Sequence, residues 1–144
     1  MCGINGILSK YQWSFEVKSN IDRMNDAIRH RGPDDNGTFI SDNIALGHVR
    51  LAIIDLSERG HQPMMSHDNR YVIIYNGEIY NFKEIKNQLK DYPFRSNTDT
   101  EVILAAYLHW GKDCLHHLNG MFAFAIYDTV EKTTFIARDR LGIK

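Results

Sequence analysis

The chain opens on a short apolar segment and then changes to helical spacing. Residues 3–8 are apolar and punctuated by glycine, which predicts a strand that begins almost at the first residue. Over residues 17–30, apolar side chains recur at helical spacing at Ile21, Met24 and Ile28. This spacing predicts a helix, and the Arg-Gly-Pro-Asp-Asp sequence at 31–35 predicts the turn that ends it.

Several later segments are rich in β-branched, aromatic and other apolar residues, a composition that favours strands. They are residues 38–40, 44–49, 71–75, 121–127 and 134–137. The first two predict a strand pair around the polar residues 41–43, and the last two predict a hairpin through 128–132. Residues 51–56 continue as apolar chain.

The second half of the chain also contains helical patterns. Residues 82–89 have the periodicity of a short helix. Thr98 and Glu101 match a capping box, in which the two side chains satisfy free N–H groups at a helix start. We therefore expect a helix after Thr98 that Gly111 stops, followed by another helical turn or two over 113–118.

The predicted strands and helices come in blocks rather than in strict alternation. Such an order favours an α+β fold, with sheets that carry helices on their outer faces, over a doubly wound parallel sheet. The 144 residues, 43% of them hydrophobic, are enough for one domain with a core and too few for two. We find no repeat, linker or low-complexity segment.

Composition argues against several classes of partner. With 17 basic and 18 acidic residues, the net charge of −1 gives no reason to expect a nucleic-acid or membrane partner. No apolar run approaches the roughly 18 residues of a spanning helix, and the N-terminus is not a signal peptide. Two cysteines are too few for a disulfide framework, which favours a reducing compartment, most simply the cytoplasm. The seven histidines lack ligand spacing, so we expect no metal site.

Cys2 stands where removal of Met1 would make it the N-terminal residue. A cysteine thiol has a pKa of about 8.5 and needs a base, and an α-amino group has a pKa of about 8. One residue would then supply both nucleophile and base. By position alone, an ordinary small residue after the start is the commoner case. Cys114, at helical spacing from apolar neighbours, is predicted to be a core cysteine.

The opening Met-Cys-Gly-Ile-x-Gly resembles that of the class II glutamine amidotransferases, a group of N-terminal-nucleophile (Ntn) hydrolases. Seven later segments resemble the asparagine synthetase branch of this group. They are residues 30–35, 47–56, 60–64, 75–81, 98–104, 120–125 and 137–144. Any one motif is weak evidence, but seven in the same order cover essentially the whole chain. The Arg-Gly-Pro-Asp sequence at 31–34 also differs from the purine-pathway and glucosamine-phosphate branches.

The resemblance implies a four-layer αββα Ntn-hydrolase sandwich of two mainly antiparallel sheets. The family's domain normally continues past Lys144, and an ATP-using synthetase domain follows it. We therefore expect residues 1–144 to be a glutaminase domain that is truncated at its C-terminus, without its synthetase domain. One sheet should then have an unpaired edge, which favours pairing between chains as a homodimer or an aggregate.

The resemblance also implies a glutamine site. Cys2 would attack the side-chain amide carbon of glutamine, release ammonia and leave a γ-glutamyl thioester. Asn76 and Gly77 resemble the family's oxyanion hole, in which two N–H donors stabilise the developing charge. Without the resemblance, an Asn-Gly pair favours a hairpin turn.

Two charged residues resemble the family's ligands for the charged groups of glutamine. Arg50 would bind the α-carboxylate with its planar fork, although an arginine after a strand is more often solvated. Asp99 would bind the α-amino group; it also suits a helix start, so one carboxylate oxygen must stay free for substrate. The remaining expected site residues are Glu78, beside the oxyanion donors, and Leu51, Ala52, Ile53 and Ile54, which act mostly through backbone.

The implied activity is hydrolysis of glutamine to glutamate and ammonia, without a cofactor in this domain. ATP and Mg²⁺ would belong only to the synthetase domain, the expected partner that receives the ammonia. Two alternatives stay open: a glutaminase domain of another class II amidotransferase, and a non-catalytic module that keeps the fold. The presence of Cys2, Arg50, Asn76, Gly77 and Asp99 together argues against the second alternative. These residues do not determine which molecule accepts the ammonia.

Overall fold

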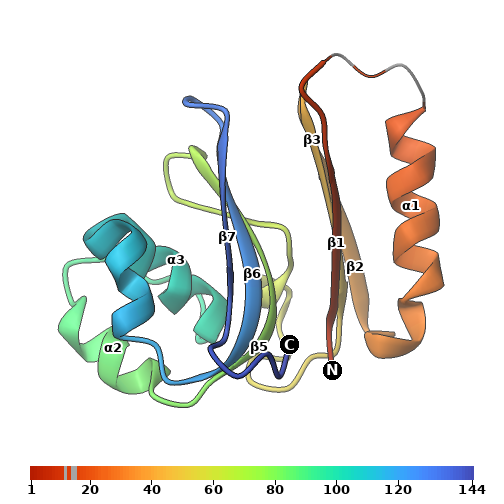
Figure 1. The fold of residues 1–144 in the computed structure, drawn as a ribbon. Coiled ribbons are helices and arrows are strands. Elements are labelled where there is room, and N and C mark those ends of the chain that lie inside the picture. Colours follow the sequence, from red (N-terminus) through yellow and green to blue (C-terminus); the bar gives the residue numbers. More distant parts are fainter. Residues whose placement is uncertain (12, 14–15) are drawn as a thin grey trace.

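The computed structural model describes residues 1–11, 13 and 16–144, which form two antiparallel sheets with helices outside them (Figure 1). One sheet has the order β1-β3-β2, made of β1 (Gly3–Leu8), β3 (Ile44–Arg50) and β2 (Asp35–Ile40). The other has the order β4-β5-β6-β7, made of β4 (Met64–Met65), β5 (Tyr71–Ile79), β6 (Gly120–Asp128) and β7 (Thr133–Arg138). The α+β fold predicted from the block pattern is confirmed.

The helices cover the two outer faces (Figure 1). Helix α1 (Val17–Ala27) packs on the first sheet through Ile21, which lies against Ala45 of β3. Helices α2 (Phe82–Gln88) and α3 (Asp99–Trp110) cover the second sheet, and a 3-10 segment (Gly111–His116) follows α3. No helix among the described residues has the length and apolar character needed to cross a membrane.

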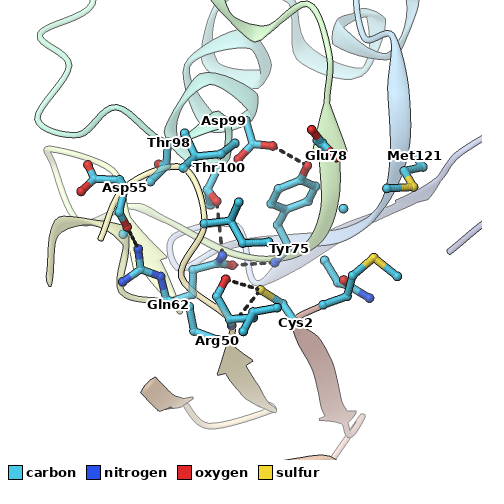
Figure 2. A pocket seen from close by; sticks show the side chains of 17 residues that line it. Cys2, Arg50, Asp55, Gln62, Tyr75, Glu78, Thr98, Asp99, Thr100 and Met121 are labelled. Atoms are coloured by element: carbon cyan, nitrogen blue, oxygen red, sulfur yellow. Dashed lines mark hydrogen bonds between the residues drawn. The ribbon is translucent and has the colours of Figure 1, made fainter. Parts of the chain in front are cut away.

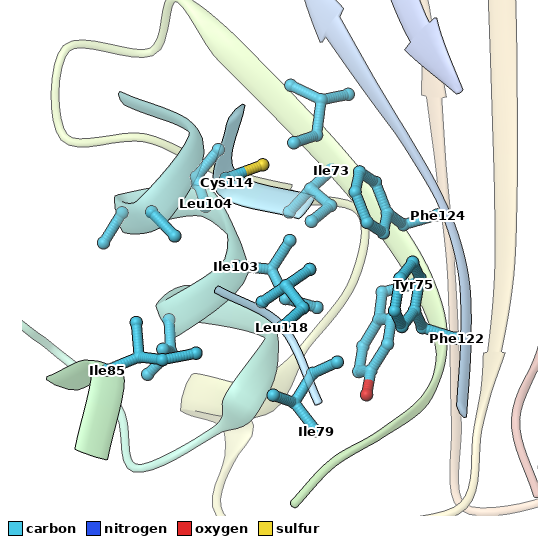
Figure 3. Close-up of a cluster of buried hydrophobic side chains, with 14 of the residues drawn as sticks. Ile73, Tyr75, Ile79, Ile85, Ile103, Leu104, Cys114, Leu118, Phe122 and Phe124 are labelled. Atoms are coloured by element: carbon cyan, nitrogen blue, oxygen red, sulfur yellow. The ribbon is translucent and has the colours of Figure 1, made fainter. Parts of the chain in front are cut away.

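Strand β5 supplies side chains to two separate cores. Ile73, Tyr75 and Ile79 pack against the helices of the second sheet (Figure 3). Val72 and Ile74 instead face the first sheet, in a cluster shared with β3 and β6. Successive strand residues point to opposite faces, so odd positions of β5 face the helices and even positions face the other sheet. The arrangement is therefore helix, sheet, sheet, helices.

The helix predicted over 17–30 ends earlier, at Ala27, and a 3-10 turn (Arg29–Arg31) follows. The reason lies at Gly32, which approaches the end of β3 so closely that a Cβ there would come within 2.5 Å of the Val49 carbonyl. The chain leaves the helix to pack against this strand, and Asp34 then donates its backbone N–H to the Arg50 carbonyl.

The prediction of a hairpin turn at 76–77, which an Asn-Gly pair favours, is wrong. Both residues lie inside β5, where Asn76 is paired with Ala123 and Gly77 with Phe122. A Cβ at Gly77 would come within 2.2 Å of the Met121 carbonyl oxygen. The glycine therefore permits close approach of two strands, and strand pairing overrides the local turn preference.

The capping box at the start of α3 is half formed. Thr98 accepts a hydrogen bond from the Glu101 backbone N–H at 3.3 Å, as predicted. The Glu101 carboxylate, which is buried, does not return to Thr98 but accepts from the backbone N–H groups of Arg95 and Ser96. It thereby holds the segment that leads into the helix.

Strand β7 lies at the edge of the second sheet, and its Ile136 side chain is 64% exposed. An apolar edge of this kind is the feature from which pairing between chains was expected. Association into a homodimer stays a prediction.

His48 links the two sheets through the buried interior. It lies on β3, and its Nε2 is 3.2 Å from the Tyr75 carbonyl oxygen on β5. Burial lowers the pKa of His48 to about 4, so the ring is neutral at pH 7 and donates from Nε2.

We expect His48 to make folding pH-dependent. The unfolded state, where the pKa is about 6.5, takes up the proton first, so stability is lost as pH falls from about 6.5 to 4. The loss is at most about 3 kcal/mol. Urea denaturation across this range should show a flatter pH dependence in His48→Gln than in wild type. His109→Gln, on the exposed side of α3, is the control and should keep the wild-type pH dependence. An unfolding free energy that falls equally with pH in wild type and His48→Gln would contradict this account.

Candidate active site

A pocket opens at the end of the sandwich where β1 begins and β3 ends (Figure 2). Gly3 is paired with Val49, which places Cys2 and Arg50 at the same end of the first sheet. The loop after β3, strand β5 and the start of α3 complete the lining. The pocket brings together most predicted site residues, namely Cys2, Arg50, Leu51, Ile53, Ile54, Asn76, Gly77, Glu78 and Asp99.

Ala52 is the predicted site residue that is not part of this lining. Its backbone N–H instead donates to the Asp34 carboxylate at 2.9 Å. The Ala52 backbone thus fixes the loop after β3 to the segment that precedes β2.

The loop of residues 51–60 wraps around the Arg50 side chain, which is only 7% exposed. The guanidinium donates from Nη1 to the Ser57 carbonyl at 2.9 Å and from Nη2 to the Asp55 carbonyl. Gly60 lies directly against it, since a Cβ there would be 2.1 Å from Nη2. A guanidinium has five N–H donors, so holding the loop still leaves donors for an anion in the pocket.

The thiol of Cys2 lies beside the backbone of Leu51. Its Sγ is 3.4 Å from the Leu51 nitrogen and 3.7 Å from the Leu51 oxygen. Arg31 donates from Nε to the Cys2 carbonyl at 3.1 Å, which fixes the backbone that carries the thiol. None of the hydrogen bonds among the described residues joins this sulfur to a histidine or a carboxylate, and Met1 lines the same pocket.

One edge of β5 faces the pocket without a strand partner. Strand β4 is paired only with Val72 and Ile73, so later residues of β5 need other partners on that side. The Tyr75 N–H donates to the Gln62 side chain at 2.7 Å, and the Ile79 N–H donates to the Asp99 carboxylate at 3.1 Å. Backbone groups two residues apart point the same way, so the Gly77 N–H between them is also directed to this side.

Asn76 is at an even position of β5 and faces the first sheet, where Cys2 lies. Its amide Oδ1 is buried and has no hydrogen-bond partner among the described residues. A buried polar atom without a partner is costly and rare in folded proteins. An unpaired amide oxygen that lines a pocket together with a thiol is an acceptor that a ligand donor can satisfy.

The carboxylate of Asp99 is buried at the first position of α3. Its Oδ2 accepts from the Tyr75 hydroxyl at 2.7 Å and from the Ile79 N–H at 3.1 Å (Figure 2). Burial raises the pKa of this carboxyl group, and hydrogen bonding from Tyr75, Ile79 and the N–H groups of Asp99 and Thr100 acts in the opposite direction. Oδ1 accepts from neither Tyr75 nor Ile79, as a substrate role for Asp99 requires.

Several residues of the pocket lining were not predicted as site residues, and two of them, Gln62 and Tyr75, bond to other lining residues. Gln62 is buried; its Oε1 accepts from Tyr75 N–H and its Nε2 donates to the Thr100 hydroxyl at 3.2 Å. Tyr75 was predicted only as part of a strand. Both residues lie in segments that resemble the family, at 60–64 and 75–81, but the resemblance gave neither residue a role.

Comparison with known proteins defines the class of this chain. The model of a family described as "Glutamine amidotransferase domain" matches residues 1–144. The chain therefore belongs to the glutamine amidotransferase domain family. It is a class II domain, homologous to the N-terminal domains of asparagine synthetases.

Two curated relatives are similar over the whole of this chain. It is 48% identical to putative asparagine synthetase 2 (glutamine-hydrolyzing) of Methanocaldococcus jannaschii and 43% identical to asparagine synthetase 3 (glutamine-hydrolyzing) of Bacillus subtilis. The match covers 31% and 24% of these relatives, so the chain spans about a quarter to a third of their length.

A solved structure shows the same fold. The glutamine phosphoribosylpyrophosphate amidotransferase from B. subtilis, complexed with ADP and GMP, matches the whole chain and 38% of its own length with a TM-score of 0.76. At 22% identity, this likeness supports the arrangement of sheets and helices alone.

We expect Gly60→Ala to weaken glutamine binding while the domain stays folded. The added methyl group would meet the movable end of Arg50 rather than backbone, so it should displace the guanidinium. A hydrogen bond to a charged group contributes about 1.5–3 kcal/mol, so the KM for glutamine should rise about tenfold or more. Steady-state kinetics with thermal denaturation measures both effects. Glu58→Ala, in the same 3-10 turn, should leave KM unchanged; an unchanged KM in Gly60→Ala would refute the role of Gly60.

Proposed function

We propose that this domain hydrolyses glutamine to glutamate and ammonia through a γ-glutamyl thioester on Cys2. The observation that carries the proposal is the convergence of Cys2, Arg50, Asn76 and Asp99 on one pocket from distant parts of the chain. Membership of the glutamine amidotransferase domain family supports it. The layered fold, with β1 beginning directly after Cys2, fits an Ntn hydrolase.

The proposed substrate pose uses both charges of glutamine. The α-carboxylate pairs with N–H donors of Arg50 that do not hold the loop, and the α-ammonium group pairs with Asp99 Oδ1. Leu51, Ile53, Ile54 and Glu78 line the remainder of the pocket. An analogue that lacks either charge would leave a buried group unpaired, so the site selects for an amino acid.

In the proposed reaction, removal of Met1 exposes the α-amino group of Cys2. This amine takes the thiol proton, and Sγ attacks the side-chain amide carbon of glutamine. The Gly77 N–H and the Asn76 side-chain amide stabilise the tetrahedral oxyanion. Its collapse breaks the carbon–nitrogen bond, and the Cys2 ammonium group gives its proton to the departing amide nitrogen, which leaves as ammonia. Water, activated by the same amine, then hydrolyses the thioester to release glutamate and restore the thiol.

The proposed destination of the ammonia is an ATP-dependent asparagine synthetase domain in the cytoplasm. The names of the relatives favour this acceptor over that of other class II amidotransferases, whose glutaminase step would be the same. The proposed glutaminase step uses no metal or cofactor; ATP and Mg²⁺ belong to the synthetase reaction. A non-catalytic module would have no need of the assembled pocket.

Cys2→Ala should abolish glutamate release from glutamine, because no nucleophile remains. Cys2→Ser should bind glutamine and turn it over very slowly, since a hydroxyl is almost un-ionised at neutral pH. Protein that retains Met1 should also be inactive, because its α-amine is blocked. Glutamate release is assayed, and mass spectrometry verifies each N-terminus. Full activity in protein shown to keep Met1 would overturn the N-terminal-nucleophile mechanism.

Asn76→Ala should lower kcat about 10²–10³-fold, because it removes one oxyanion donor. The KM for glutamine should change little, since this donor acts mainly on the transition state. Asn119→Ala, an exposed asparagine just before β6, is the matched control and should keep wild-type kinetics. A fall in kcat below tenfold for Asn76→Ala would remove Asn76 from the oxyanion hole.

A further inference from the structure

The proposed amine ligand, Asp99, depends on a neighbour that the reaction does not otherwise use. The Tyr75 hydroxyl lies 2.7 Å from Asp99 Oδ2, and both residues are buried. The Tyr75 ring is part of the helix-facing core, where Ile79 and Phe122 belong to the same cluster (Figure 3). Packing thus fixes the ring independently of the hydrogen bond, and the hydroxyl is presented to the carboxylate in a set direction.

We propose that Tyr75 is a positioning and specificity-determining residue: its hydroxyl holds Asp99 as a carboxylate with Oδ1 turned to the pocket. It thereby sets the selection for substrates that carry an α-ammonium group. This inference rests on the proposed glutaminase function and deepens it, since it identifies the group that keeps the amine ligand competent.

The geometry divides the two carboxylate oxygens between structure and substrate. Oδ2 is held from two points of β5, by the Tyr75 hydroxyl and by the Ile79 N–H. Two donors at one oxygen restrict rotation of the carboxylate, so Oδ1 keeps one orientation. These two residues flank Gly77: the carboxylate holds the edge of β5 at the Ile79 N–H, and Gln62 holds it at the Tyr75 N–H.

Electrostatics gives the Tyr75 hydroxyl a second role. Burial raises the pKa of Asp99, and the hydrogen bond from Tyr75 is the strongest of the interactions that lower it. The Tyr75 phenol itself stays protonated, since burial and the nearby Asp99 raise its pKa well above the usual range. The other ionisable groups in the pocket lining are the N-terminal α-amino group of Met1 and the side chains of Cys2, Arg50, Asp55 and Glu78. The buried Glu101 of α3 is engaged with Arg95 and Ser96.

Tyr75→Phe separates the hydroxyl from the packing, because the ring is kept. A matched control is Tyr127→Phe in β6, whose buried hydroxyl donates to Asn43 at 2.9 Å. Asn43 and Tyr127 are not part of the pocket lining. Both variants lose one buried tyrosine hydroxyl, and only the first loses a contact to Asp99.

Ligand binding is measured by calorimetry in the Cys2→Ala protein without Met1, where no turnover occurs. The two probes are L-glutamine and glutaramate, which is glutamine without its α-amino group. Tyr75→Phe should weaken glutamine binding about tenfold at pH 8, because a hydrogen bond to a charged group is lost. The loss should grow as pH falls, because Asp99 protonates more easily without this bond. Tyr75→Phe should leave glutaramate binding unchanged, and Tyr127→Phe should change neither.

Carbon-13 NMR titration of the Asp99 carboxyl group supplies a readout that needs neither ligand nor activity. The pKa of Asp99 should be higher in Tyr75→Phe than in wild type and unchanged in Tyr127→Phe. The inference is overturned if the Asp99 pKa does not rise in Tyr75→Phe. It is also overturned if this variant loses as much affinity for glutaramate as for glutamine. Failure of the proposed function is a separate result, namely wild-type protein without Met1 that releases no glutamate from glutamine.

Discussion

The unequal pairing of the two edges of β5 is the constraint on which this site depends. One edge forms a ladder with β6 along the whole strand, whereas β4 covers only Val72 and Ile73 on the other. Buried backbone donors need partners, so the remaining N–H groups of that edge must be satisfied by side chains. Gln62 and Asp99 serve two of them. The pocket is thus lined by an edge of β5 that β4 does not cover.

The same constraint links stability to chemistry. Asp99 is needed to satisfy the Ile79 N–H, and Gln62 joins Tyr75 to the start of α3 through Thr100. These residues hold α3 against the sheet whether or not a ligand is bound. Gly77 lies between the two satisfied positions, so its N–H is directed at the pocket by strand geometry alone. In its proposed role as an oxyanion donor, this N–H would require no reorganisation when charge develops.

Arg50 shows how a buried charge shapes the neighbouring loop. Arg50 is buried, and the carbonyl oxygens of Asp55 and Ser57 supply part of its hydrogen bonding. Gly60 permits this close packing because any side chain there would collide with it. The path of the loop is therefore set by its contacts with Arg50, and Arg50 is placed by its position at the end of β3. By sequence alone, a solvated arginine is the commoner case at this point.

The sequence by itself determined the elements whose patterns are local. These include the strand at 3–8, the helix after Thr98 and the hairpin through 128–132, because periodicity and turn residues are properties of neighbouring positions. Motifs in register also indicated the family. Tertiary structure alone decided that Asn76 and Gly77 lie in a strand, that α1 ends at Ala27 and that Gln62 and Tyr75 belong to the pocket. Those outcomes depend on contacts between residues distant in the chain, where strand pairing and burial outweigh local preference.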